Sequence, residues 1–179
     1  MTLYDERNEE IRKAFNQILL KKDPMSLIYI DECGFDGAIY RDYGYSPKGC
    51  RLMENISGKR LARISIIAGF CQNSCIAPMY FKGYCDTEVV VAWVKKELLP
   101  RLKAGQTVIW DNASFHKSPR LKELIEGAGC ELLFLPPYSP DLNPIEQFWS
   151  WLKAWIRRLN LPHLHITQKI EKVFTKLET

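Results

Sequence analysis

The sequence lacks any long hydrophobic run, and its first residues are charged. The longest strongly apolar run, Ile64–Cys71, is far shorter than the ~18 residues that a membrane-spanning helix requires. The acidic and basic residues near the N-terminus do not form the apolar stretch of a secretory signal. The sequence therefore predicts no membrane partner and an intracellular, cytoplasmic location.

Histidines are scarce, and the cysteines do not form a metal-binding pattern. Cys71 and Cys75 are four residues apart, with no second cysteine pair and no nearby cluster of the three histidines, so a zinc site is not predicted. Without a secretion signal, free thiols are expected rather than disulfides. The six cysteines are Cys33, Cys50, Cys71, Cys75, Cys85 and Cys130.

The bulk composition is that of an ordinary globular domain. The chain has 179 residues, of which 46% are hydrophobic and 26% charged, and it contains no internal repeat or low-complexity linker. At this length one domain can bury roughly 70% of its unfolded surface. The net charge of +4 permits a nucleic-acid partner but does not establish one.

Hydrophobic periodicity predicts strands first and alternating helices and strands afterwards. The short polar segment 72–74 predicts a hairpin, and Asn143-Pro144 predicts the start of a helix that ends near Leu159. The order β-β-β-α-β-α-β-α predicts an α/β fold of the ribonuclease H-like kind, a mixed five-stranded sheet flanked by helices. The predicted strands are 26–32, 60–70, 75–81, 107–110 and 131–135, and the other predicted helices are 1–24, 87–103, 119–126 and 167–177.

The same pattern predicts three segments of unequal size. Residues 1–24 are interpreted as a solvated helical lead-in, residues 25–160 as one ribonuclease H-like domain, and residues 161–179 as a helical tail.

Three carboxylates follow or begin these core elements. Asp31 closes an apolar run, Asp111 follows a second one, and Glu146 lies one turn into a helix, with 34 residues between Asp111 and Glu146. Mg²⁺ prefers hard oxygen ligands, and two such ions can activate the nucleophile and stabilise the leaving oxygen in phosphodiester chemistry. The three acids therefore predict a divalent-metal site.

Each acid also has an ordinary structural interpretation. Asp31 could simply end its strand, and Asp111-Asn112 could be a turn after a strand. Glu146 stands three residues after Asn143, the spacing of a capping box, in which its side chain would fold back onto the helix start. From spacing alone these alternatives remain open.

The helix that carries Glu146 has a wide apolar face and a polar stripe beside it. The stripe contains Glu146, Ser150, Lys153 and Arg157 at helical spacing. A carboxylate followed by two cations would suit a DNA backbone that enters the site. A solvated helix face is the alternative.

The motifs around the three acids resemble those of the DDE transposases of the mariner-like superfamily, and more narrowly its bacterial insertion-sequence branch. The resemblance covers about residues 26–158, and the 34-residue spacing matches that family. The segment 43–49 also resembles the glycine-proline loop of the family. The matching motifs are Tyr29-Ile30-Asp31-Glu32, Trp110-Asp111-Asn112-Ala113-Ser114-Phe115-His116, and Leu135-Pro136-Pro137-Tyr138-Ser139-Pro140-Asp141-Leu142-Asn143-Pro144-Ile145-Glu146.

The resemblance implies that Asp31, Asp111 and Glu146 bind two Mg²⁺ ions, with Mn²⁺ as an expected substitute. It implies cleavage of DNA at transposon ends and transfer of the freed 3′-hydroxyl into target DNA, by a homodimer associated with the bacterial nucleoid. Asn112 and His116 match motif positions and are expected either to support the metal ligands, to contact DNA or to stabilise their loop. Glu32 matches a position outside the triad and, on a strand, should point away from Asp31.

One feature departs from the family pattern. Family members usually carry an N-terminal helix-turn-helix region, and too few residues precede the first predicted strand for such a domain. The expectation is a catalytic half that works with a separate helix-turn-helix protein, or a non-catalytic DNA-binding or regulatory remnant. A ribonuclease H-like nuclease with other substrates is a third alternative.

Overall fold

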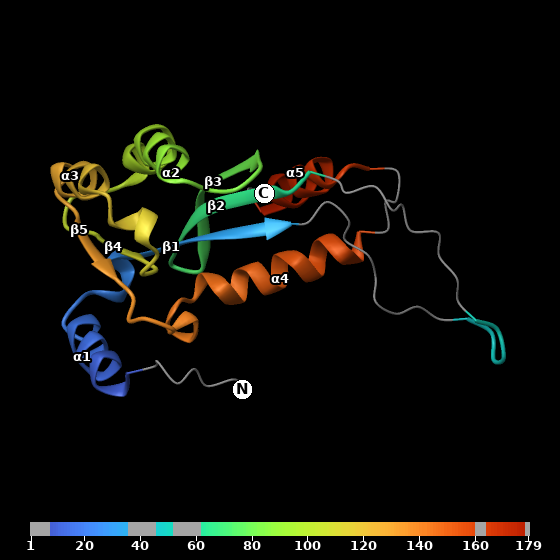
Figure 1. Ribbon diagram of the computed structural model, residues 1–179, viewed down its shortest axis with the longest axis horizontal. Coiled ribbons are helices and arrows are strands. Elements are labelled where there is room, and N and C mark those ends of the chain that lie inside the picture. Colours follow the sequence, from blue (N-terminus) through green and yellow to red (C-terminus); the bar gives the residue numbers. More distant parts are fainter. Residues whose placement is uncertain (1–7, 36–45, 52–61, 160–163, 178–179) are drawn as a thin grey trace.

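A computed structural model describes residues 8–35, 46–51, 62–159 and 164–177 (Figure 1). Residues 43–45 of the predicted loop 43–49 and the boundary at residue 160 lie outside these ranges. Within them, no helix is both long and apolar enough to cross a membrane.

A mixed five-stranded sheet forms the centre of the fold, as the sequence predicts. Its spatial order is β3-β2-β1-β4-β5. The pairs β1–β2 and β2–β3 are antiparallel, whereas β1–β4 and β4–β5 are parallel. The strands are β1 (Leu27–Phe35), β2 (Ile64–Cys71), β3 (Ser74–Lys82), β4 (Thr107–Trp110) and β5 (Glu131–Phe134).

The predicted hairpin between β2 and β3 is confirmed. Gln72 and Asn73 both have positive φ angles, 51° and 60°, which is the geometry of a two-residue turn that matches the twist of antiparallel strands. Further along β3, Ala77 has φ 51° beside an irregularity in the register. Its carbonyl accepts a 2.7 Å hydrogen bond from the buried indole of Trp93.

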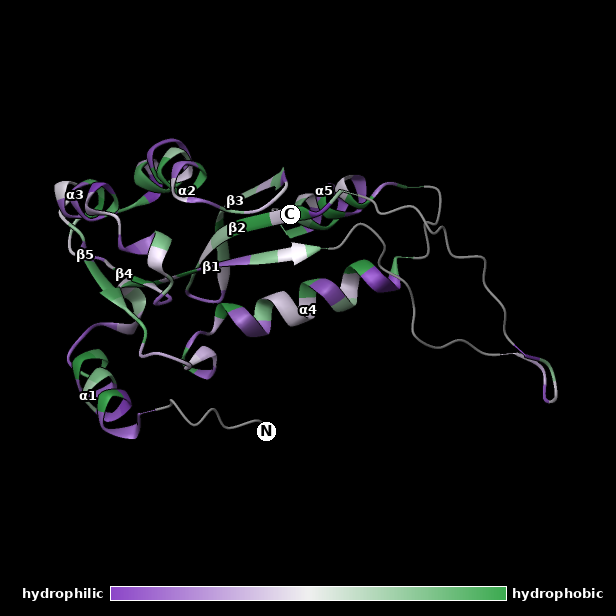
Figure 2. Cartoon of the chain, viewed as in Figure 1, coloured by the Kyte–Doolittle hydropathy of each residue, from purple (hydrophilic) through white to green (hydrophobic). Residues whose placement is uncertain are grey.

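Helices cover both faces of the sheet, as the ribbon shows (Figure 1). One face packs against α2 and α3 through a core that includes Ile28, Trp93 and Ile125. The other face packs against α4 and α5, with Ile66, Leu152 and Ile170 in the core, and against α1. Apolar and polar residues alternate along α4, consistent with one buried face (Figure 2). The helices are α1 (Glu9–Leu19), α2 (Thr87–Trp93), α3 (Pro119–Gly127), α4 (Ile145–Arg158) and α5 (Ile166–Leu177).

The helix predicted over 87–103 is not one regular α-helix. After α2 the chain continues as a π-helical turn, η2 (Val94–Leu98), and a 3₁₀ turn, η3 (Leu99–Arg101). Pro100 has no N–H to donate and clashes with the carbonyl four residues earlier in an α-helix. Pro100 therefore accounts for the wider π-helical turn and the tighter 3₁₀ turn in place of a regular α-helix.

The first strand is longer than the sequence predicts, and this corrects the expected position of Asp31. The prediction placed Asp31 at the end of a strand, but β1 continues to Phe35. The reason is antiparallel pairing with β2, which holds Asp31 opposite Ala68 and extends to Phe35 opposite Ile64. Asp31 therefore lies in the middle of a paired strand.

The N-terminal helix is anchored to the domain by more than its apolar side. Phe15 is 6% exposed and packs with Ile109 and Leu135. Arg12 is also 6% exposed, and its guanidinium donates to both carboxylate oxygens of Asp141, at 3.1 and 2.6 Å. Asp141 belongs to the segment that leads into α4, so α1 is part of the packing around that segment.

Replacing Arg12 by alanine should destabilise the folded chain by about 1–3 kcal/mol, because a buried, doubly hydrogen-bonded charge is lost. Chemical denaturation of the two proteins measures the difference. Arg120→Ala is the matched control, since Arg120 pairs with Glu88 at the surface and such pairs contribute about 0–1 kcal/mol. Equal losses in both variants would contradict a structural role for the Arg12–Asp141 pair.

Candidate active site

Strand register brings Asp31 and Asp111 together. In the parallel pair β1–β4, Tyr29 lies opposite Ile109. Two residues further on, Asp31 and Asp111 are level with one another, and their side chains follow the parity of the same sheet face. β4 ends at Trp110 while β1 continues, so a crevice opens at this point. Ligands in open α/β sheets bind in such crevices beyond the carboxyl ends of strands.

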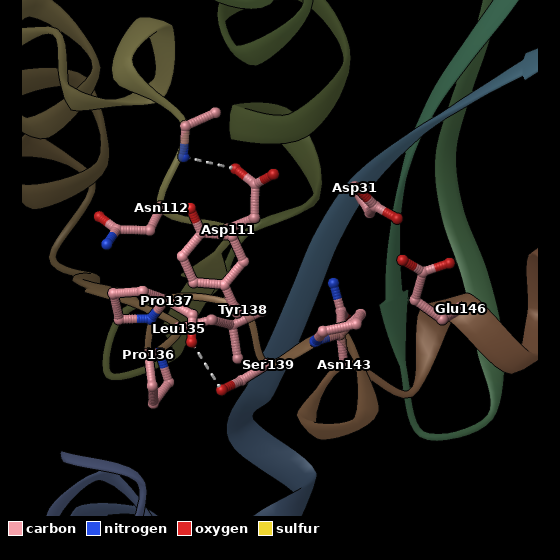
Figure 3. A pocket seen from close by; sticks show the side chains of 12 residues that line it. Asp31, Asp111, Asn112, Leu135, Pro136, Pro137, Tyr138, Ser139, Asn143 and Glu146 are labelled. Carbon is pink, nitrogen blue, oxygen red and sulfur yellow. Dashed lines mark hydrogen bonds between the residues drawn. The ribbon is translucent and has the colours of Figure 1, made fainter. Parts of the chain in front are cut away.

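Glu146 completes the group from the first turn of α4. The Asp31 and Glu146 carboxylates point toward one another, and Asp111 lies across the pocket from them (Figure 3). All three residues line one open pocket of about 450 Å³. The rest of the lining comes from Asn112, Ala113, Leu135, Pro136, Pro137, Tyr138, Ser139, Pro140 and Asn143. Residues far apart in the sequence thus meet in one place.

The expected capping role of Asn143 is wrong. The helix begins one residue later than predicted, with Pro144 at the N-cap, and no side chain caps it. Instead, the backbone carbonyl of Asn143 accepts a 3.1 Å hydrogen bond from the N–H of Glu146. A backbone turn therefore replaces the capping box, and the Glu146 side chain lines the pocket.

The electrostatics of the pocket oppose three ionised carboxylates. Burial, together with the negative charges of Glu146 and Glu32, raises the pKa of Asp31 to about 8. Burial also raises the pKa of Glu146, although the positive charge of Lys153 counteracts this effect. A cation in the pocket would reduce the repulsion among these carboxylates.

Asp31 is held by a residue that sequence reasoning assigned only to the apolar face. The indole N–H of Trp149 donates a 3.0 Å hydrogen bond to Oδ2 of Asp31. Trp149 is 2% exposed and lies one turn after Glu146, so the same helix supplies one acid and orients another. The sequence did contain a signal for this contact, because the indole N–H of a buried tryptophan usually needs a hydrogen-bond partner.

Asp111 is held by the loop that follows it. Its Oδ1 accepts a 3.0 Å hydrogen bond from the backbone N–H of Ala113 and contacts Nδ1 of His116. Burial favours the neutral acid, but these hydrogen bonds outweigh it and lower the pKa of Asp111. Burial likewise opposes the charged form of His116, yet its hydrogen bonds to Asp111 and Glu32 raise the pKa of His116 to about 9.

The remaining predicted site residues occupy different positions. Asn112 lines the pocket, whereas His116 is fully buried behind Asp111 and has no surface to offer to DNA. Lys153 lies close enough to Cys33 to hydrogen-bond it and to influence Glu146, and Arg157 is exposed one turn further along α4. The polar stripe of the sequence is therefore present and begins at the pocket.

The donor set fits a divalent ion with oxygen ligands. Among the described residues, no group of three or more His, Cys, Asp and Glu side chains lies close enough together to hold a metal ion. Mg²⁺ keeps several water ligands and is usually bound by one or two carboxylates together with substrate phosphate. An open pocket with mutually repelling carboxylates suits that mode of binding better than a closed cage would.

The sheet order and the helices on both faces define a ribonuclease H-like catalytic domain, which is the fold that the sequence predicts. The sequence model of the family of DDE superfamily endonucleases matches residues 26–166, and the chain belongs to this family.

Comparison with known proteins gives a relative in sequence and structures of similar fold. An uncharacterized protein of Sinorhizobium fredii is 36% identical over 76 residues, which cover 39% of this chain and 50% of that protein. The catalytic domain of Mos1 mariner transposase has a TM-score of 0.54 at 18% identity, covering 99% of this chain and 93% of that one.

Larger Mos1 structures are also similar in fold. A paired-end complex with the left transposon end has a TM-score of 0.60 at 15% identity, and a paired-end complex with Mg has 0.59 at 16% identity. The alignments cover 99% of this chain in both cases, and 62% and 63% of the Mos1 chains. The chain therefore spans about half to two thirds of the length of these relatives.

Proposed function

We propose that this chain is the catalytic domain of a DDE transposase, which cleaves DNA at transposon ends and transfers the 3′-hydroxyl into target DNA. The observation that carries the proposal is the convergence of Asp31, Asp111 and Glu146 on one pocket. Family membership supports nuclease chemistry in general. The resemblance of the motifs to mariner-like transposases supports the more specific reaction.

The three acids would hold two Mg²⁺ ions, or Mn²⁺ in their place, and such ions supply activation of the attacking oxygen and stabilisation of the leaving oxygen. The similarity to a Mos1 paired-end complex with Mg is consistent with this cofactor. The attacking oxygen comes from water or from the DNA 3′-hydroxyl, so no side chain acts as nucleophile. The roles of this chain are to fix the acids on rigid elements and to bind the DNA backbone.

Rigid support is visible for each of the three acids. Asp31 lies in a strand that is paired with β2 before and after this residue, Asp111 is held by its own loop, and Glu146 is carried by a helix whose other face is buried. In-line phosphoryl chemistry depends on such positioning. Asn112, which lines the same pocket, is proposed to contact the DNA that enters it.

The DNA is proposed to run along α4 from Glu146 toward Lys153 and Arg157. Both are cations, and phosphate contacts of this kind give affinity without sequence specificity. A homodimer on DNA and recognition of the ends by a helix-turn-helix segment, in the same or a separate chain, complete the proposal. The paired-end architecture of Mos1 is consistent with two copies at paired ends.

Metal-dependent nicking of a labelled transposon-end duplex tests the proposal. The parent chain should nick the duplex with Mg²⁺ or Mn²⁺ and not with chelator, whereas Asp111→Asn should be inactive under all conditions. A helix-turn-helix partner is added in a parallel series to supply end recognition. Equal inactivity of both proteins in every series would favour the non-catalytic remnant.

The same assay separates a general nuclease from a transposase. Cleavage of RNA–DNA hybrids without joining of a 3′-hydroxyl to target DNA would favour the ribonuclease H-like alternative. Products in which a transposon end is joined to target DNA support the proposed reaction.

Replacing Lys153 and Arg157 together by alanine should weaken DNA binding and reduce the slope of log K against log salt by about 2, because each phosphate contact contributes about 0.9 to that slope. Binding measured across a range of salt concentrations gives the slope. The control is Lys122→Ala on the exposed side of α3, which should leave the slope unchanged. An unaltered slope in the double variant would rule out this DNA path.

A further inference from the structure

His116 joins two carboxylates that belong to different strands. Its Nδ1 contacts Oδ1 of Asp111, which follows β4, and its Nε2 lies 3.1 Å from Oε1 of Glu32, which is part of β1. The His116 side chain is fully buried, and the Glu32 side chain is 15% exposed. The two contacts form a continuous link from β1 to Asp111 behind the pocket.

The imidazole ring is fixed in its plane as well as at its two nitrogens. Its centroid lies 4.7 Å from the ring of Trp110 and 4.1 Å from the ring of Phe115. A ring packed on two aromatic neighbours has little freedom to rotate. His116 therefore couples the position of the Asp111 carboxylate closely to that of Glu32.

Asp111 has a particular need for such a link. β4 ends at Trp110, and the β1–β4 ladder ends at the pair Tyr29–Ile109, so strand pairing does not hold the backbone of Asp111. The N–H of Ala113 and His116 both engage Oδ1. Neither of these two contacts uses the other carboxylate oxygen, Oδ2.

Glu32 itself does not belong to the pocket. It follows Asp31 on β1, so its side chain points to the opposite sheet face, as the sequence predicts. Glu32 does not line the pocket. Asp31, which precedes it in the sequence, and Asp111, to which it is linked through His116, both do. Glu32 can thus act on the site through His116 rather than by direct binding.

We propose that Glu32 is a positioning residue of the metal site, which holds the Asp111 carboxylate in its binding orientation through His116. The inference rests on the proposed function, since it concerns the same metal ligands. A group that hydrogen-bonds a metal ligand, as His116 does with Asp111, typically changes metal affinity by 10- to 100-fold when it is removed, and Glu32 acts through that group.

The test compares Glu32→Ala, Glu32→Gln, His116→Asn and the double variant Glu32→Ala/His116→Asn. Gln keeps an oxygen that can accept from Nε2–H, and Asn keeps a donor near the position of Nδ1 but has no second nitrogen to reach Glu32. Glu131→Ala is the matched control, because Glu131 is a strand carboxylate paired with Lys22 away from the pocket. Melting temperature without metal, Mn²⁺-induced thermal stabilisation without DNA, and the Mn²⁺ concentration for half-maximal nicking are measured for each protein.

In Glu32→Ala and in His116→Asn, the Mn²⁺ concentration for half-maximal effect should rise at least about tenfold. In Glu32→Gln it should stay within about threefold of the parent, and in the double variant it should be no higher than in the single ones, because both changes break the same link. The control should match the parent.

Two results overturn the inference while leaving the proposed function intact. One is a lower melting temperature in Glu32→Ala with an unchanged Mn²⁺ requirement, which is a purely structural effect. The other is a double variant whose loss is the product of the two single losses, which means independent roles. If the parent chain shows no Mn²⁺ stabilisation and no metal-dependent nicking, the proposed function fails, and the positioning role fails with it.

Discussion

Replacing Glu146 by glutamine should abolish metal-dependent DNA cleavage, with a loss on the order of 10³-fold or more. Gln has nearly the same shape but presents a neutral amide, which is a poor ligand for a hard divalent ion. The fold should survive, because the start of α4 does not depend on a side-chain cap. Nicking rates with saturating Mn²⁺ and a thermal melt of the same preparation measure the two effects.

The melt distinguishes loss of chemistry from loss of structure. Burial raises the pKa of Glu146, and the negative charge of Asp111 raises it further. Removing one of two like charges should keep the melting temperature of the metal-free variant equal to or above that of the parent. Nicking by Glu146→Gln within about tenfold of the parent rate would refute the assignment of the triad.

Replacing Asp31 by asparagine should stabilise the metal-free protein above about pH 5, on the order of a few kcal/mol by pH 8. The pKa of Asp31 is raised from 3.8 to about 8, so the folded state binds this proton more tightly than the unfolded chain does. The contribution of Asp31 to the stability of the parent is therefore greatest below about pH 4, decreases as pH rises through this window, and changes no further above about pH 8. Asparagine has no such proton and avoids this loss.

Denaturation curves from pH 4.5 to 8 in chelator measure the difference. His116, with a pKa raised to about 9, stabilises the folded state below its unfolded value of 6.5 and loses this effect as pH rises to 9, but it does so in both proteins. The interval from pH 4.5 to 6.5 therefore isolates the carboxylates. Glu126→Gln on the exposed side of α3 is the control. If the stabilities of the parent and of Asp31→Asn changed in parallel with pH, the result would contradict a raised pKa of Asp31 in the folded protein.

Mg²⁺ added to the same series should stabilise the parent most at high pH, where Asp31 is ionised in the absence of metal. Asp31→Asn should gain much less from the metal. An equal gain in both proteins would mean that Asp31 is not a ligand.

Local sequence patterns were sufficient to predict most elements of the fold. The hairpin at Gln72–Asn73 requires residues that accept positive φ, and the helix of Glu146 has a clear apolar face. The end of β1 was not predictable, because its last residues are held by pairing with β2 rather than by their own hydrophobicity. The irregular helical region around Pro100 was missed for a different reason: helical periodicity does not distinguish α from π turns.

The sequence by itself determined the fold class of this protein and the residues proposed for its site. Three acids in motifs of defined spacing, on strands and a helix that the hydrophobic pattern also defines, were enough to predict the fold and to nominate Asp31, Asp111 and Glu146. Tertiary structure decided how those acids are supported. The contacts from Trp149 to Asp31 and from Glu32 through His116 to Asp111 join residues 118, 84 and 5 positions apart in the sequence. Such contacts depend on strand register and on helix packing across the sheet, which no local pattern encodes.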